Sequence, residues 1–195
     1  MRIVAIDKEY INRFAAEDRE FLLKHGRPCI LVVILRFRGK RRDFAVPFRS
    51  NIAPNVPKEQ YFALPPRPST KAKYRHGIHY IKMFPIEKRY QRVFRIEGNR
   101  YYETIQATIN VHAKELVAAC QSYLNRYEEY GRPRFAVDLD KLSKLLDEEN
   151  EAIRLRQSVA LPADSAPQTN SADSGRLAGS LQTKGRHAHG HARDS

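Results

Sequence analysis

The segment FAVPFRSNI at residues 44–52 follows closely on the apolar run ILVVIL at residues 30–35, and together they decide the predicted fold. Residues 29–37 and 43–48 predict two antiparallel strands, because the glycine and cations of RGKR at 38–41 are typical of a hairpin turn. The second strand breaks at Pro47, and Arg49, Ser50 and Asn51 follow it. A cation, a hydroxyl and an amide at a strand end suit the binding and attack of a phosphodiester.

Positive charge is the second strong signal. The 195 residues hold 35 lysines and arginines against 22 acids, a formal net charge of +13. One basic stretch, residues 67–100, is interleaved with tyrosines on which bases can stack, and another lies at 36–42, whereas 138–151 is acidic. Nucleic acid is the polyanion that this pattern favours. The candidate contacts outside the strand end are Lys71, Lys73, Arg75, Lys82, Lys88 and Arg89.

The composition also bounds the organisation of the chain. Residues 1–156 predict one folded domain, and residues 157–195 predict a disordered tail, since aromatics and periodicity disappear there. Cys29 and Cys120 are the only cysteines, and no signal peptide is recognised, which favours a cytoplasmic protein with reduced thiols. The longest apolar run is too short to span a bilayer, so no membrane partner is expected. We predict no metal site and no cofactor.

Periodicity predicts a mixed α+β domain. Strands are expected at 3–6, at 80–86 and, as a short or extended piece, at 90–96. Helices are expected at 8–24, 100–130 and 139–156, and the proline-rich residues 53–73 predict a long loop.

Residues 1 to about 145 resemble the endoribonuclease toxins of type III toxin–antitoxin systems, the ToxN/AbiQ/TenpN group. The resemblance rests on the order of several features: Tyr10-Ile11 in an N-terminal helix, Arg27-Pro28 before an apolar strand, the FAVPFRSNI segment, GIHYIKMFPI at residues 77–86, and a long C-terminal helix. The string PFRSNI at 47–52 is most similar to the TenpN branch.

The resemblance implies a twisted, antiparallel β-barrel-like core, similar to the MazF/Kid toxins, with helices around it. It implies metal-independent cleavage of cellular or phage RNA, with growth inhibition and phage defence as the consequences. It also implies that a small structured antitoxin RNA, made from a tandem-repeat precursor, holds the toxin inactive in a toxin–RNA hetero-oligomer.

The resemblance further suggests site residues. Ser50 matches the family's active-site hydroxyl, and Arg49 and Asn51 are candidate phosphate ligands beside it. Arg27 stands where relatives carry an essential lysine, and Tyr10 matches a tyrosine near the family's active site. The alternatives from the residues alone are a turn serine, a surface cation, a turn asparagine and, for Tyr10, core packing.

The general acid and base are left open by the sequence. Arg27 is a poor proton donor or acceptor because its pKa is too high, and the lysine that relatives carry after the serine is absent. His76 and His79 are possible acid/base groups, since imidazole titrates near neutral pH. Tyr123 lies on an apolar helical stripe and is interpreted as a core residue.

Two other functions compete. A non-catalytic RNA- or DNA-binding protein would explain the charge without cleavage, and its affinity would fall steeply with salt. A protein-interaction module that presents the prolines near residues 65–68 is a third reading, but it leaves the positive charge unexplained.

Overall fold

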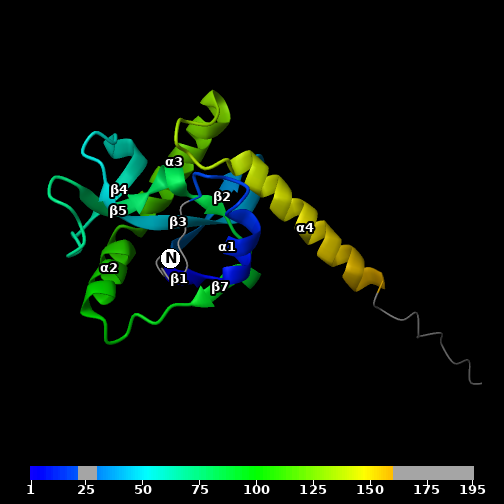
Figure 1. Ribbon diagram of the computed structural model, residues 1–195, viewed down its shortest axis with the longest axis horizontal. Helices are drawn as coiled ribbons and strands as arrows, with labels where there is room; N and C mark the ends of the chain where they lie inside the picture. Colours follow the sequence, from blue (N-terminus) through cyan, green and yellow to red (C-terminus); the bar gives the residue numbers. More distant parts are fainter. Residues whose placement is uncertain (22–29, 160–195) are drawn as a thin grey trace, which may run out of the picture. The chain divides into compact units, whose positions relative to one another are not determined.

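An open antiparallel sheet of seven strands, with four α-helices, makes up the described residues, 1–21 and 30–159, of the computed structural model (Figure 1). In chain order the elements are β1 (Arg2–Ile6), α1 (Lys8–Phe14), β2 (Ile30–Phe37), β3 (Lys40–Ile52), β4 (Tyr61–Leu64), β5 (Arg75–His79), β6 (Phe84–Pro85), β7 (Gln91–Val93), α2 (Arg100–Val111), α3 (Ala113–Tyr130) and α4 (Leu139–Val159). The predicted α+β class is therefore confirmed. The sheet runs β4-β5-β3-β2-β1-β7 and does not close, so "barrel-like" describes it only loosely.

The predicted hairpin of β2 and β3 forms the centre of the sheet. Arg38 and Gly39 turn the chain with positive φ angles of 49° and 74°, and the register runs from the pair Phe37–Lys40 to the pair Ile30–Pro47. The strand β3 is longer than predicted, because it continues past Pro47 to Ile52. Ser50 consequently lies inside a strand and not beyond the end of one.

β3 changes its partner at Pro47. Up to this residue it pairs with β2, and from Phe48 onward it pairs with β5 on its other edge. Proline has no N–H to donate, so it is suited to the point where one ladder ends. The two halves of β3 thus join the hairpin to the separate pair of strands β4 and β5.

The strand predicted at 80–86 is wrong in its bounds. β5 and β6 both pair with the edge of β3 that faces away from β2, through the pairs Phe48–Ile78 and Ala45–Phe84. Between these pairs the chain has more residues than β3 can match. The surplus forms the 3₁₀ turn Tyr80–Lys82, which is held by a hydrogen bond of 3.0 Å from Val137 N–H to the Ile81 carbonyl.

Three further boundaries differ from the predictions. The first helix ends at Phe14, since Asp18 turns inward and its carboxylate accepts hydrogen bonds from the backbone N–H groups of Glu20 and Asp138. The predicted loop at 53–73 contains β4. The helix predicted at 100–130 is two helices, α2 and α3, that meet at His112.

The break at His112 has a local cause. The hydroxyls of Thr104 and Thr108 both donate to carbonyls one turn earlier in α2, a contact that bends helices.

The last helix, α4, was expected at 139–156 and extends to Val159. Its final turns are exposed and run away from the sheet (Figure 1).

Aromatic rings fill much of the core. Tyr10 contacts the rings of Phe14, Phe84 and Tyr90, and Phe37 contacts Phe44 and Tyr127 of α3, so helices and sheet share one apolar interior. The buried stripe predicted along the C-terminal helices is confirmed at Ile105, Ile109, Leu116, Cys120, Tyr123 and Tyr127, but His112, which was predicted on the same stripe, is half-exposed at the break between the helices. Within residues 1–21 and 30–159, none of the helices has the length and apolarity that a bilayer crossing needs.

Gly77 permits the close approach of β4 to β5. A Cβ atom at this position would lie 2.2 Å from the Phe62 carbonyl oxygen, which is part of the backbone and cannot rotate away. We expect Gly77→Ala to lower the free energy of unfolding by about 2–3 kcal/mol, the usual cost of forcing atoms into a packed interior. The measurement is urea unfolding followed by circular dichroism.

Gly39→Ala is the matched control. A Cβ atom there meets nothing within 4 Å, although the φ of +74° is strained for alanine, so a loss of only about 1 kcal/mol is expected. Equal stability of Gly77→Ala and the wild type would contradict the close approach of the two strands.

Candidate functional site

The segment Arg49-Ser50-Asn51 lies on an irregular part of β3. Arg49 is opposite Gly77 and Ile52 is opposite Arg75, so β3 has one more residue than β5 between these pairs. This is a β-bulge, a feature that redirects side chains and is over-represented next to active sites. The bulge therefore sets the directions of Ser50 and Asn51.

Arg49 shares a face of the sheet with His79. Residues opposite each other in an antiparallel pair project to the same side, so Arg49 projects to the side of Gly77. Alternation along β5 places Arg75 and His79 on that side too. We call this side the Arg49 face, after Arg49, Arg75, Gly77 and His79. Gly77 has no side chain, and the Phe62 carbonyl oxygen occupies the place that its Cβ would take.

His79 is the unusual group of the Arg49 face. Its side chain is buried, with a residue exposure of 5%, and among the described residues neither ring nitrogen has a hydrogen-bond partner. Burial lowers the pKa of His79 to about 3, and the positive charges of Arg49 and Lys82 add to this effect. At neutral pH the imidazole is thus uncharged and has one nitrogen that can accept a proton.

Ser50 and Asn51 differ in what they contact. Ser50 is half-buried, and its hydroxyl makes no hydrogen bond within the part of the chain that the structure describes. Ser50 lies inside β3 and not in a turn. Asn51 uses its side-chain oxygen to accept a hydrogen bond of 2.9 Å from Lys71 N–H, which ties the loop before β5 to β3.

His76 lies on the opposite side of β5 from His79. Its Nδ1 is 2.7 Å from the Pro65 carbonyl and 3.0 Å from the Tyr101 hydroxyl, so it is held by hydrogen bonds on two sides. Burial lowers the pKa of His76, the Pro65 carbonyl acts in the opposite direction, and the charge of Arg67 lowers it further. The structure brings only His79 to the same face as Arg49.

Three other candidate residues are placed in or near the interior. Tyr10 is fully buried, and its hydroxyl donates a hydrogen bond of 2.5 Å to the Pro85 carbonyl. Tyr123 is also buried, in agreement with its interpretation as a core residue. Lys82 is buried, and its ammonium lies 2.6 Å from both a Glu20 carboxylate oxygen and the Phe135 carbonyl. Arg27 lies outside the described residues.

The two basic stretches of the sequence have different surroundings. The hairpin at 36–42 is paired with the acidic helix α4: Arg38 with Asp140, and both Lys40 and Arg42 with Asp147. Arg89 is likewise held by Glu149, in an ion pair of 2.7 Å. These contacts neutralise much of the charge at this end of the molecule.

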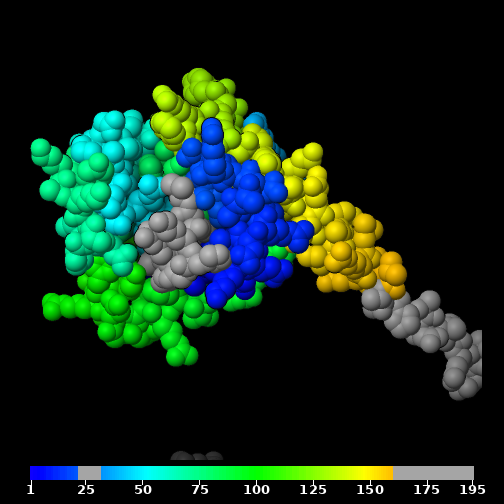
Figure 2. All heavy atoms as spheres, in the orientation of Figure 1, coloured from blue at the N-terminus to red at the C-terminus, as the bar shows by residue number. Residues whose placement is uncertain are grey.

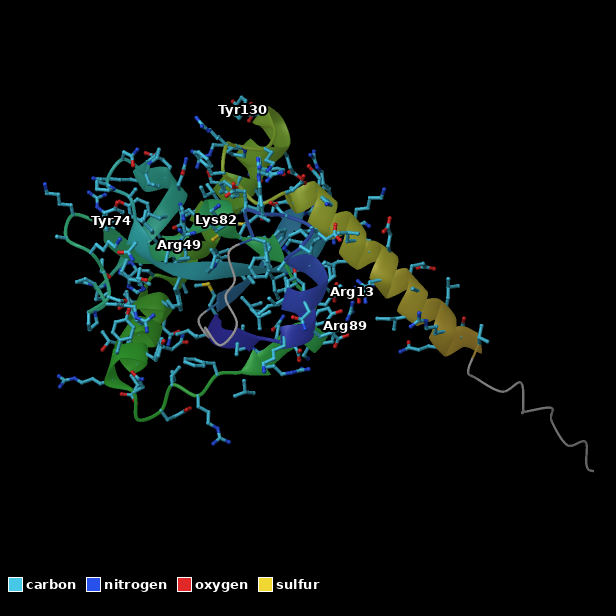
Figure 3. All side chains as sticks on the ribbon, viewed as in Figure 1. Arg13, Arg49, Tyr74, Lys82, Arg89 and Tyr130 are labelled. Atoms are coloured by element: carbon cyan, nitrogen blue, oxygen red, sulfur yellow. The ribbon has the colours of Figure 1, made fainter. Side chains whose placement is uncertain are left out.

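The other end keeps its charge. Lys71, Lys73 and Arg75 are exposed, and within residues 1–21 and 30–159 none of them is paired with a carboxylate, although Arg75 donates to the hydroxyl of Tyr61. Lys88 is also exposed, but it lies next to Arg89. Figure 3 shows this division: Arg49 and Tyr74 lie over β3 to β5, whereas Arg13 and Arg89 lie beside α4.

Two features of the site were missed by the analysis of the sequence. The pairing of the hairpin with α4 could have been found, because the basic run 36–42 and the acidic run 138–151 are complementary. The stacking of Arg67 against the rings of Tyr101 and Tyr102, at 5.0 and 5.5 Å, had no such signal. Within the described part of the chain, no three His, Cys, Asp or Glu side chains gather in a way that could hold a metal ion.

The burial of His79 makes a prediction about pH. Unfolded His79 binds a proton below a pH of about 6.5, whereas folded His79 stays neutral down to about 3, so stability is lost as the pH falls through this window. Between pH 7.5 and 5.0 this group alone lowers the free energy of unfolding by about 2 kcal/mol. We expect His79→Leu to lose correspondingly less stability than the wild type over this interval, as measured by urea unfolding.

His112→Gln serves as the control, because His112 lies half-exposed between α2 and α3. It should keep the pH dependence of the wild type. The same dependence in His79→Leu would show that His79 is accessible to protons in the folded state.

Comparisons with known proteins give a likeness of fold. No family model matches the chain, and no curated protein matches it in sequence. A solved chain from work described as "A processed non-coding RNA regulates a bacterial antiviral system" superposes with a TM-score of 0.58 at 15% identity, over 74% of this chain and 96% of the other. A second, from work on a bacterial type III toxin–antitoxin system in which a non-coding RNA pseudoknot selectively inhibits the toxin, has a TM-score of 0.58 at 16% identity, over 76% and 97%. This chain thus shares the fold of both.

Proposed function

We propose that this protein is the toxin of a type III toxin–antitoxin system, a metal-independent endoribonuclease that a structured antitoxin RNA holds inactive. The observation that carries the proposal is the fold shared with the two solved chains over nearly their whole length. The Arg49 face supports it independently, because a guanidinium and a neutral imidazole share this face at the end of the molecule that keeps its positive charge, and Ser50 follows Arg49 directly in the bulge of β3.

Metal-independent RNA cleavage uses the substrate's own 2′-hydroxyl, and the protein has to move protons and stabilise charge. The 2′-oxygen of the substrate attacks the adjacent phosphorus, the bond from phosphorus to the 5′-oxygen breaks, and a 2′,3′-cyclic phosphate remains. The proton of the 2′-hydroxyl goes to a base, and the leaving 5′-oxygen gains one. We assign Arg49 to the charge that develops on the phosphoryl oxygens and Ser50 to a hydrogen bond with the phosphate or the 2′-hydroxyl.

His79 is our candidate for the proton acceptor. A pKa near 3, which burial mainly causes, makes an imidazole a weak base, but phosphate bound at Arg49 would offset the positive charge that lowers this pKa further. The base would then gain strength when RNA is present. Arg27, which corresponds to an essential lysine in the family that the sequence resembles, stays a prediction for charge stabilisation.

The exposed positive charge beside the site suits the binding of RNA. Arg75 belongs to the Arg49 face, Lys71 and Lys73 lie in the loop just before it, and all three would contact phosphates of both the substrate and the antitoxin RNA. Inhibition by the antitoxin then needs only that its RNA cover this surface. Assembly of toxin and RNA into a hetero-oligomer in the cytoplasm, and a role in growth inhibition and phage defence, belong to the same proposal.

Ser50→Ala tests the assignment. Because loss of one hydrogen bond made in the transition state costs about 10²–10³ in rate, cleavage of RNA should fall by roughly this factor. Binding of RNA and thermal stability should change little, since Ser50 makes no hydrogen bond to other described residues. The measurements are cleavage of total cellular RNA in EDTA, RNA affinity, and growth inhibition on expression.

Two variants control this experiment. Ser50→Thr keeps a hydroxyl and should keep activity, and Ser122→Ala removes an exposed serine of α3 and should behave as the wild type. Full cleavage by Ser50→Ala would contradict the role of Ser50. RNA binding that falls with salt, with no cleavage by the wild type, would favour the alternative of a non-catalytic RNA-binding protein.

A further inference from the structure

The turn between α3 and α4 holds a phenylalanine in a strained backbone conformation. Ala136 N–H donates a hydrogen bond of 3.1 Å to the Pro133 carbonyl, and Phe135, the third residue of this turn, has a φ of 65°. Glycine or asparagine normally occupies such a position, since a bulky side chain costs of order 1–3 kcal/mol there. A phenylalanine at this position therefore needs a compensating interaction or a function.

Packing in the core does not compensate for the strained backbone of Phe135. Phe135 is 56% exposed, and the guanidinium of Arg134 lies 4.6 Å from the centre of its ring. The backbone of the turn is fixed from below, because the Phe135 carbonyl accepts a hydrogen bond of 2.6 Å from the buried ammonium of Lys82. The fold thus holds the ring outward, in contact with solvent.

The turn forms one wall of an open depression of about 740 Å³, and residues 17–20 line it as well. In Figure 2 these two segments, blue and yellow-green, lie against each other. Every acid that lines it is paired: Asp18 and Asp138 with Arg132, Glu17 with Lys141, and Glu20 with Lys82. The four acids of the lining are matched in number by Arg19, Arg132, Arg134 and Lys141, but Arg19 and Arg134 have no carboxylate partner among the described residues.

The depression adjoins the Arg49 face through Lys82. The ammonium of Lys82 contacts the Phe135 carbonyl, and its charge acts on His79, as does that of Arg49. Both cations therefore lie near the His79 ring, and in the view of Figure 3 their labels fall over the same part of the sheet. A single-stranded RNA whose phosphate lies at Arg49 could accordingly place a neighbouring nucleotide at Phe135.

We propose that Phe135 and Arg134 form a subsite that stacks one nucleobase of single-stranded RNA next to the cleaved phosphate. This inference rests on the proposed function and assigns a substrate contact to it. An exposed aromatic ring beside a guanidinium offers both stacking and cation–π attraction to a base, and phosphates would find Arg19 and Arg134 in the same depression.

Phe135→Gly separates stacking from folding, because glycine relieves the strained φ. We expect this variant to be at least as stable as the wild type and to bind RNA about 5- to 100-fold more weakly, the effect of losing one stacked base. The probe is a pool of short single-stranded RNAs with 2′-O-methyl riboses, which cannot be cleaved, and one central 2-aminopurine. Quenching of its fluorescence reports stacking, and anisotropy of a terminal dye reports affinity.

Three variants complete the design. Phe135→Leu keeps an apolar side chain and should lose the quenching, and Phe135→Trp keeps an aromatic ring and should retain it. Tyr130→Ala removes another exposed aromatic, on α3, and should bind as the wild type. Wild-type affinity and quenching in Phe135→Gly would overturn the subsite. The proposed function would be unaffected by that result, because the Ser50 variants test it separately. Failure of the wild type to bind any RNA would overturn both.

Discussion

The change of partner along β3 is the constraint on which the rest of the structure depends. Up to Pro47 this strand belongs to the hairpin with β2, and beyond Pro47 it pairs with β5 on its opposite edge. The bulge after Arg49 and the close approach at Gly77 both belong to this second ladder. Without the pairing of β3 with β5, Arg49 and Ser50 would lie in a loop, and nothing would hold Arg49 and His79 on the same face of the sheet.

Ion pairs leave several cations at one end of the molecule without carboxylate partners among the described residues. The acids of α4 pair with three hairpin cations and with Arg89, so these four cations hold the last helix and are not available to an external anion. Glu149 shows the strength of this contact. Burial tends to raise its pKa, but hydrogen bonds from Tyr90 and Arg89, with the charges of Arg89 and Arg13, outweigh that effect and lower it. Lys71, Lys73 and Arg75 remain for an external polyanion.

Much of the fold could be predicted from the sequence, because the hairpin and the C-terminal helices follow local patterns of apolar residues. The length of β3 could not, since Arg49, Ser50 and Asn51 are polar and join a strand only through β5, which is remote in sequence. The order of residues pointed to Ser50 and Arg49, and their roles stay predictions. Which histidine shares a face with Arg49, and which cations are already paired, depends on tertiary contacts that no local pattern records.

We propose that this chain cuts RNA through the 2′-hydroxyl of its substrate without a metal ion. The most direct test compares, in EDTA, an RNA that the wild type cleaves with the same RNA carrying one 2′-deoxynucleotide on the 5′ side of the cut. We predict cleavage of the first, with a 2′,3′-cyclic phosphate at the new end, and none of the second. Cleavage of both RNAs, or cleavage only after a divalent metal is restored, would contradict it.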